Sequence, residues 1–162
     1  MANAEPAVGI IMGSQSDWET MKHAAETLTR LGIACETRIA SAHRTPDRLA
    51  EYAQSARDRG LKVIIAGAGM AAALPGATAA LTPLPVIGVP MEGKMMGGLD
   101  ALLAMAQMPP GVPVGAVALD KPGAKNAALL AIRIMSLSDE SLVKKLDDFR
   151  EKNRDKILST KL

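Results

Sequence analysis

The segment SAHRTP (residues 41–46) places a hydroxyl, an imidazole and a guanidinium together directly before a predicted helix. An imidazole titrates near neutral pH, so His43 can both give and take a proton in one catalytic cycle. Arg44 can bind a phosphate through its forked guanidinium, with the Ser41 hydroxyl beside it. An ordinary capping or surface histidine is the alternative interpretation of His43. For the only other histidine, His23, which lies within a predicted helix, we expect a structural role.

A second candidate loop, GSQSDW (residues 13–18), combines small residues with free backbone N–H groups at another helix start. Such a helix start can hold a phosphate, and Asp17 can accept hydrogen bonds from a ribose diol. The loop has neither the Walker pattern nor the G-x-G-x-x-G fingerprint. The alternatives are that Ser14 and Ser16 are turn and capping residues, and that Asp17 stabilises the helix dipole.

The third loop, GAGMAAALPG (residues 67–76), offers no functional side chain. Its glycines allow the backbone to approach a flat ring, although close packing of a helix against a sheet explains them equally well. Taken together, the three loops indicate a small ribose phosphate with a compact ring as ligand. They offer one proton-transferring group, no metal ligands and no nucleophilic cysteine.

The composition excludes several classes of partner. Aromatic residues make up 2% of the 162 residues and the net charge is +2, so neither base stacking nor phosphate tracking favours nucleic acid. A lone Cys35 cannot form an internal disulfide, and two histidines cannot build a His-rich metal site. We therefore expect a cytoplasmic protein that holds no metal.

No membrane segment is expected. The start of the chain, MANAEPAVGI, lacks the basic end, apolar stretch and cleavage signal of a secretory leader. The uncharged run of residues 63–91 is interrupted by four prolines, which argue against a membrane-spanning helix.

Short apolar runs alternate with segments of helical periodicity, which predicts an α/β fold around a five-stranded parallel sheet. The strands are expected at Ala7–Met12, Cys35–Ile39, Val63–Ala66, Pro85–Val89 and Val114–Ala118. A helix is expected at 18–31, between an S-x-x-E capping box (Ser16 and Glu19) and Gly32. A second is expected at 46–60, with Thr45 as its cap and Pro46 as its first residue. Three more helices are expected at 71–81, 98–107 and 124–135. A ligand is then expected beyond the carboxyl ends of the strands.

The last segment, residues 139–158, is densely charged and carries an apolar stripe of Leu142, Leu146, Phe149 and Ile157. It predicts an amphipathic helix packed on its own subunit, or alternatively on a neighbouring one. We expect a single domain over residues 1–162, with a core at about 7–136 and this helix at its end. The many alanine-rich helix surfaces favour a large homo-oligomer.

Six motifs, spaced in order along nearly the whole chain, carry a family resemblance. They are GSQSDW (13–18), SAHRTP (41–46), GAG…LPG (67–76), LPVIGVP (84–90), QMPPGVPV (107–114) and GAKNAALLA (123–131). Together they resemble the family of N5-carboxyaminoimidazole ribonucleotide mutases of purine biosynthesis. This is the PurE family, class I, also called the catalytic subunit of phosphoribosylaminoimidazole carboxylase.

The resemblance implies a flavodoxin-like three-layer fold and a homo-octamer. It implies an isomerase that moves a carboxylate from an exocyclic nitrogen to a ring carbon of aminoimidazole ribonucleotide, with no metal, ATP or organic cofactor. It also implies a functional link to the ATP-dependent synthetase that makes the carbamate. By position, His43 is similar to the family's general acid/base. Ser14, Ser16, Ser41 and Arg44 match residues that hold the 5′-phosphate and neighbouring groups, and Asp17 matches one that holds ribose hydroxyls.

The third loop departs from the family pattern GAGGAAHLPG, because Met70 replaces a glycine and Ala73 replaces the histidine. The related class that carboxylates aminoimidazole ribonucleotide directly with CO2 also lacks this histidine, so direct carboxylation is the alternative function. The mutase is favoured by the SAHRTP and QMP-x-G-x-PV segments, since the other class is expected to carry a lysine in place of Arg44. A non-catalytic nucleotide-binding or receiver-type module is a third hypothesis, but Gly13 and Ser14 stand where a receiver needs acidic residues.

Overall fold

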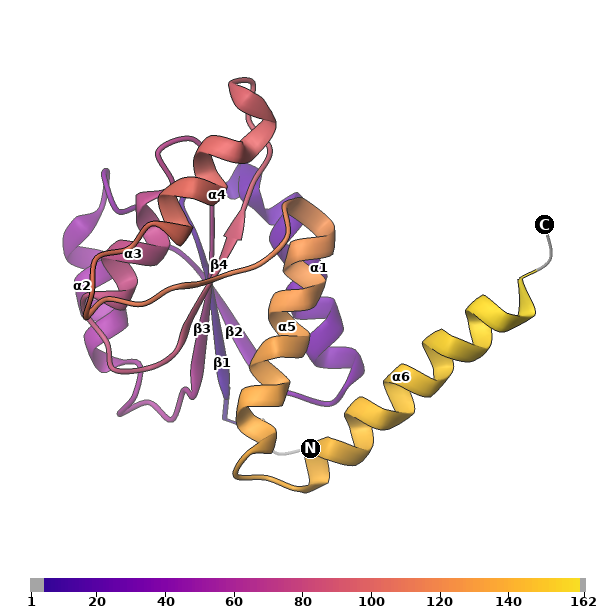
Figure 1. Cartoon of the computed structure of the whole chain (residues 1–162). Helices are drawn as coiled ribbons and strands as arrows, with labels where there is room; N and C mark the ends of the chain where they lie inside the picture. Colours follow the sequence, from indigo (N-terminus) through magenta and orange to yellow (C-terminus); the bar gives the residue numbers. More distant parts are fainter. Residues whose placement is uncertain (1–4, 161–162) are drawn as a thin grey trace.

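Five short apolar segments pair in parallel into one sheet in the computed structural model, which describes residues 5–160 (Figure 1). The strands are β1 (Val8–Met12), β2 (Cys35–Ile39), β3 (Val63–Ala68), β4 (Val86–Pro90) and β5 (Gly115–Ala116), in the order β2-β1-β3-β4-β5. The strands β1, β3 and β4 are buried along their whole length, as expected for parallel strands with both faces covered. The predicted α/β fold with a five-stranded parallel sheet is confirmed.

The bounds of four strands differ from the prediction. The strand β1 begins at Val8 instead of Ala7, and β4 is shifted by one residue to Val86–Pro90. The strand β3 continues to Ala68, whereas β5 has only two residues. The shortening of β5 follows from its place at the edge, where it pairs only with β4, and from Pro113, which lacks an N–H to donate. The ends of the predicted domain, residues 1–4 and 161–162, lie outside the described residues.

Two helices, α1 (Trp18–Arg30) and α5 (Asp120–Ser136), lie side by side over one face of the sheet (Figure 1). Their contact is made by small side chains, since Ala24, Ala124, Ala127, Ala128 and Ala131 are all fully buried. Small residues allow close approach of the two helices, which explains why this alanine-rich sequence needs almost no aromatic residue to fill its core.

The opposite face is covered by three shorter helices, α2 (Pro46–Ser55), α3 (Ala73–Ala79) and α4 (Leu99–Ala106) (Figure 1). Two 3₁₀ turns, η1 (Gln15–Asp17) and η2 (Met96–Gly98), precede α1 and α4. Among residues 5–160 no helix combines the length and the apolar character that crossing a membrane requires.

The start of α1 differs from the prediction. The capping box is not formed by Ser16 and Glu19, because the 3₁₀ turn moves the start of the helical segment upstream; instead the backbone N–H of Ser14 donates to Asp17 Oδ2 at 3.0 Å. The predicted end is confirmed. Gly32 has φ +71, and the backbone N–H groups of Gly32 and Ile33 close a Schellman motif onto Thr29 and Leu28.

Other helix boundaries shift by a few residues. The helix α2 ends at Ser55 and is followed by turns up to Gly60, which has φ +90. The helix α3 begins two residues late because Ala72 is left-handed (φ +45), and α5 begins at Asp120 rather than Ala124. The helix α4 lacks only the outermost residue of the predicted span at each end.

The last helix, α6 (Ser141–Ser159), projects away from the rest of the molecule (Figure 1). Its start packs on the body: Leu142 is buried, Leu146 adds to the same core, and the Arg30 guanidinium lies 5.2 Å from the centroid of the Phe149 ring. Ile157, however, is 75% exposed. Packing of the whole apolar stripe on its own subunit is therefore wrong, because the straight helix leaves the body after its first turns.

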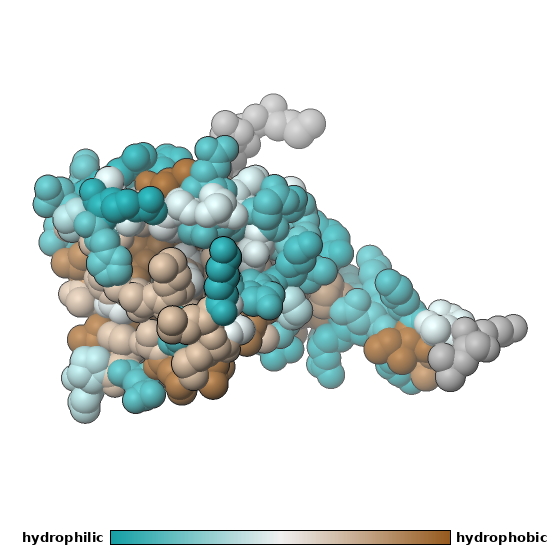
Figure 2. Space-filling view, turned by 90° about the horizontal axis from the view of Figure 1, so that it is seen from above, coloured by the Kyte–Doolittle hydropathy of each residue, from teal (hydrophilic) through white to brown (hydrophobic). Residues whose placement is uncertain are grey.

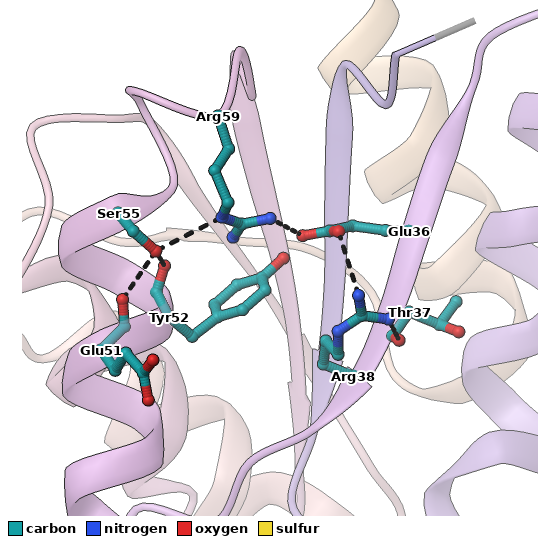
Figure 3. Close-up of polar contacts among 7 residues, drawn as sticks. All are labelled: Glu36, Thr37, Arg38, Glu51, Tyr52, Ser55 and Arg59. Atoms are coloured by element: carbon teal, nitrogen blue, oxygen red, sulfur yellow. Dashed lines mark hydrogen bonds and ion pairs between the residues drawn. The ribbon is translucent and has the colours of Figure 1, made fainter. Parts of the chain in front are cut away.

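The outer edge of the sheet is joined to α2 by a charged cluster (Figure 3). Arg59 Nη1 donates to Glu36 Oε1 at 2.5 Å, and the Arg59 guanidinium lies 4.7 Å from the centroid of the Tyr52 ring. Arg38 makes a second, longer ion pair with Glu36. Burial alone would raise the pKa of the Glu36 carboxyl, but the hydrogen bond and charge of Arg59 outweigh it and lower the pKa below its usual value.

A pH-dependent contribution to stability follows from this ion pair. A carboxyl whose pKa is lowered by folding stabilises the folded state while it is ionised, and this contribution is lost as the pH falls through the folded-state pKa. We expect Glu36→Gln to lower the free energy of unfolding by about 1 kcal/mol at pH 7. The difference from the unsubstituted protein should disappear at pH values well below 4.5, the usual value for this carboxyl.

Urea unfolding between pH 7 and pH 3 measures this difference. Glu151→Gln is the control, because within residues 5–160 this exposed carboxylate of α6 makes no ion pair. A loss of stability in Glu36→Gln that stays constant over the whole pH range would contradict the assignment.

Candidate active site

The register of the strands brings the candidate loops to one edge of the sheet. Met12, at the end of β1, lies opposite Ile39 of β2 and Gly67 of β3. The loops that follow these strands therefore leave the sheet side by side at its carboxyl edge. The helices α1 and α2 lie on opposite faces, so the connections diverge here, and such a point of divergence is where parallel α/β sheets bind ligands.

The first loop forms a tight polar turn. The Ser14 and Ser16 hydroxyl oxygens lie 2.5 Å apart, and Ser16 Oγ donates weakly to Asp17 Oδ1 at 3.4 Å. Asp17 also accepts the backbone N–H of Ser14, so its carboxylate fixes the turn from within. The structure thus brings together Ser14, Ser16 and Asp17, and it gives Asp17 a capping function.

The second loop is built around Ser41, which is largely buried. Its backbone N–H donates to Thr45 Oγ1 at 2.9 Å, and its Oγ accepts the backbone N–H of Arg44 at 3.2 Å. Thr45 occupies the predicted capping position before Pro46, but its hydroxyl bonds to the backbone of Ser41 instead of an N–H of α2. These bonds hold the turn that presents residues 42–44.

Arg44 joins the two loops. Its Nη2 donates to the Gly13 carbonyl at 2.6 Å, and its Nε donates to Ser41 Oγ at 3.3 Å. A guanidinium carries five N–H donors. These two bonds leave three donors without a partner among residues 5–160, while the plane of the group is held between the serine loop and the Ser41 turn. A group fixed in this way is suited to bind an anion at the carboxyl edge.

The His43 side chain is exposed in the turn at residues 42–44. Within residues 5–160 its ring makes no hydrogen bond or ion pair, so both nitrogens are open to a ligand. His23, in α1, is different. Its Nδ1 lies 3.1 Å from Glu26 Oε2, and its Nε2 is buried without a hydrogen-bond partner in the described part of the chain. The two histidines therefore occupy different environments, and only His43 lies in the loops at the carboxyl edge.

The predicted third loop begins inside β3, where Gly67 is a packing residue. A Cβ atom on Gly67 would lie 2.4 Å from Met21 Sδ and 2.5 Å from Met91 Cε, so this glycine makes room for two methionines. Beyond it the backbone is strained, because Met70 and Ala72 both have positive φ (57° and 45°). The Met70 side chain is 78% exposed, and Ala73 begins α3.

One residue that positions the carboxyl edge was missed. Asp120 Oδ1 accepts the backbone N–H of Glu92 at 3.0 Å and so fastens the loop after β4 to the start of α5. Asp120 has φ +53, a conformation that aspartate tolerates better than most residues. The Asp-x-Pro sequence at residues 120–122 is the signal, since acidic residues and proline are typical of the first helical turn.

Among residues 5–160, no three His, Cys, Asp or Glu residues are grouped so as to hold a metal ion. The polar groups brought together at the carboxyl edge are instead hydroxyls, one imidazole, one guanidinium and one carboxylate.

Comparisons with known proteins agree with this arrangement. The chain is 57% identical to the N5-carboxyaminoimidazole ribonucleotide mutase of Bacillus subtilis over 156 residues, which cover 96% of each protein. It is 60% identical over 153 residues to the bifunctional purine synthesis protein purC/E of Dictyostelium discoideum, of whose length it spans only 15%. The crystal structure of Treponema denticola PurE matches with a TM-score of 0.84 and 32% identity over 94% of each chain. The family model for AIR carboxylase matches residues 7–156, and the chain belongs to this family.

Proposed function

We propose that the protein is an enzyme of purine biosynthesis that converts N5-carboxyaminoimidazole ribonucleotide into 4-carboxy-5-aminoimidazole ribonucleotide. The names of its relatives support this reaction, among them mutases that match nearly the whole chain. The observation that carries the proposal for this chain is the bond from Arg44 to the Gly13 carbonyl, at 2.6 Å. It holds an anion-binding guanidinium beside the serine loop, and His43 precedes Arg44 in the same turn.

Each loop then has a part in binding the substrate. The Ser14, Ser16 and Ser41 hydroxyls and the open N–H donors of Arg44 bind the 5′-phosphate and its neighbouring groups. Asp17 accepts hydrogen bonds from the ribose hydroxyls, for which its carboxylate is already held in place by the Ser14 N–H. The imidazole ring of the substrate faces the loop after β3, which offers backbone groups and the Met70 side chain.

His43 transfers one proton in each direction. In the first step the C–N bond of the carbamate breaks, its electron pair stays on the nitrogen, and protonated His43 supplies the proton, so that CO2 leaves. In the second step the ring carbon forms a bond to CO2, and the neutral imidazole takes the proton that this carbon loses. The protonation state of His43 is restored at the end of the cycle, which requires no metal, ATP or organic cofactor.

A second reaction has a specific residue in its favour. Ala73 offers no side chain that reaches the carboxylate of the substrate or closes the site. An enzyme that takes CO2 from solution does not need to retain a released molecule, so direct carboxylation of aminoimidazole ribonucleotide is the competing function.

Turnover of the purified protein with the carbamate substrate distinguishes the two functions. The mutase is expected to form the carboxylated imidazole, followed by its ultraviolet absorbance, at the same rate with and without added bicarbonate. Product that forms from aminoimidazole ribonucleotide and bicarbonate, but not from the carbamate, would assign direct carboxylation. Nucleotide binding without either reaction would indicate a non-catalytic module.

The proton-transfer function of His43 is tested by His43→Asn. We expect turnover of the carbamate to fall by a factor of about 10² to 10⁴, the usual contribution of general acid/base catalysis. Substrate binding measured by calorimetry should persist, because Arg44 and the serines remain. His23→Asn is the matched control, and its turnover should stay close to that of the unsubstituted protein. Full activity of His43→Asn would exclude the assigned mechanism.

We also propose that the protein assembles into a large homo-oligomer, an octamer by its resemblance to the family. Apolar side chains support this proposal, since Leu137, Ile157 and Leu158 are more than two-thirds exposed on and beside α6. Figure 2 shows brown, apolar surface at the far end of this projecting helix. Such surface is usually covered by a partner.

Sedimentation velocity at micromolar concentration tests the assembly. We expect a single species several times the 16.9 kDa mass of the chain. The double variant Ile157→Glu/Leu158→Glu should shift the distribution toward smaller species, whereas Lys152→Glu/Lys156→Glu, which alters charge on the same helix, should not. A stable monomer of the unsubstituted protein would contradict the proposal.

We place the enzyme in the cytoplasm, next to the ATP-dependent synthetase that makes the carbamate. The single Cys35, which has no partner for an internal disulfide, suits a reducing compartment. The bifunctional relative supports a link between steps of purine synthesis, since one chain there contains a segment similar to this protein.

A further inference from the structure

A cationic hollow lies at the outer edge of the sheet, outside the candidate active site. It has a volume of about 260 Å³ between β2 and α2, and it is lined by Arg38, Ala40, Arg48, Glu51, Tyr52, Ser55 and Arg59. None of these residues belongs to the candidate active site. Figure 3 shows how most of this group is arranged, with Arg59 and Arg38 reaching toward Glu36 from opposite sides.

The charges in this hollow are unbalanced. Three guanidinium groups line it, and Glu36 binds two of them, with Arg59 at 2.5 Å and Arg38 at 3.5 Å. The other nearby carboxylate, Glu51, makes no ion pair within residues 5–160, and neither does Arg48. Three guanidiniums carry many more N–H donors than Glu36, the Thr37 carbonyl and Ser55 Oγ can accept.

The position of Arg59 is fixed before any ligand arrives. Its Nε donates to Ser55 Oγ at 3.3 Å, its Nη1 donates to Glu36, and its plane lies over the Tyr52 ring. Tyr52 is only 8% exposed, so its ring forms a rigid apolar floor under this guanidinium. A guanidinium held in this way loses little side-chain entropy when it binds a ligand.

We propose that this hollow is a binding site for a small oxyanion, either a phosphate or a carboxylate. The donor surplus of Arg38, Arg48 and Arg59 fits the paired oxygens of such groups. The volume of about 260 Å³ lies below the usual range for sites that hold a whole small molecule, so it suits an isolated anion or the anionic end of a larger ligand.

The hollow adjoins the turn that carries His43 and Arg44. Ala40 lines it and is followed directly by Ser41, whose hydroxyl binds Arg44. Arg48 lies in the first turns of α2, one helical turn beyond Arg44. An anion bound in the hollow therefore lies beside the turn that carries His43, but its binding does not depend on the function proposed above.

Calorimetric titration of the full-length protein with inorganic phosphate tests the site, with succinate in a second arm. Arg38→Gln/Arg48→Gln removes two exposed guanidiniums from the hollow. Arg133→Gln/Arg154→Gln removes the same charge from exposed positions on α5 and α6 and is the control. Arg44→Gln separates the two sites, and circular dichroism shows that each variant is folded.

We expect two phosphates per chain for the unsubstituted protein and for the control, one for Arg38→Gln/Arg48→Gln, and one for Arg44→Gln. Succinate in place of phosphate at the hollow would assign it to carboxylates, which also supports the proposal. Equal binding of both anions by Arg38→Gln/Arg48→Gln and by the control would overturn it, as would the absence of any binding that these two substitutions remove. If Arg44→Gln changes nothing while Arg38→Gln/Arg48→Gln loses a phosphate, the function proposed for the Arg44 site fails and the hollow stands.

Discussion

The parallel pairing of β1 with both β2 and β3 is the constraint on which the rest of the structure depends. Met12 is aligned with Ile39 on one side and with Gly67 on the other, so three loops leave the sheet at the same level. The crossover through α1 covers one face and the crossover through α2 covers the other. This register places the loop after β2 beside the residue that follows β1, so that Arg44 reaches the Gly13 carbonyl.

The near absence of aromatic residues imposes a second constraint, because an aliphatic core must still be filled. Methionines packed against glycines solve this problem at two positions. Met21 and Met91 fill the space above Gly67, and Met105 Sδ lies 2.8 Å from where a Cβ of Gly88 would be. A flexible thioether adapts to such gaps, while the bare glycine backbone lets the helices lie close to the sheet. Gly67 and Gly88 are therefore packing residues, even though Gly67 lies at the carboxyl edge of the sheet.

The sequence predicts the sheet well because buried parallel strands are uninterrupted apolar runs, as in Val63–Ala68. It predicts the capping box poorly, since Ser14-x-x-Asp17 and Ser16-x-x-Glu19 both satisfy a capping pattern and only the 3₁₀ turn decides between them. Residue types also identify Arg44 as an anion-binding candidate, but its bond to Gly13 spans 31 residues and follows from strand register alone. For α6, an amphipathic pattern gives the apolar face without saying which surface covers Ile157.

The carboxyl edge of the sheet is divided into two halves of different physical character. The loops after β1 and β2 hold the hydroxyls, the imidazole and the guanidinium, and no non-glycine residue described there has positive φ. The loops after β3, β4 and β5 contain all four non-glycine residues with positive φ in the described chain: Met70, Ala72, Met96 and Asp120. Each such residue costs on the order of 1 kcal/mol or more, and it persists only where surrounding contacts enforce it.

Contacts of this kind are present in the strained half. Gly98 fits against Leu119 and the Met91 carbonyl with no room for a Cβ, and Asp120 binds the Glu92 backbone. The exposed apolar side chains of this half include Met70 and Met96, at 78% and 61% exposure, while the charged Glu92 and Lys94 are exposed in the loop after β4. A ribonucleotide has the same division, since its phosphate and ribose need charged and hydroxyl partners whereas its base presents flat faces. For the proposed substrate, this division favours a phosphate toward Arg44 and a ring toward the loop after β3, where the Met70 side chain is exposed.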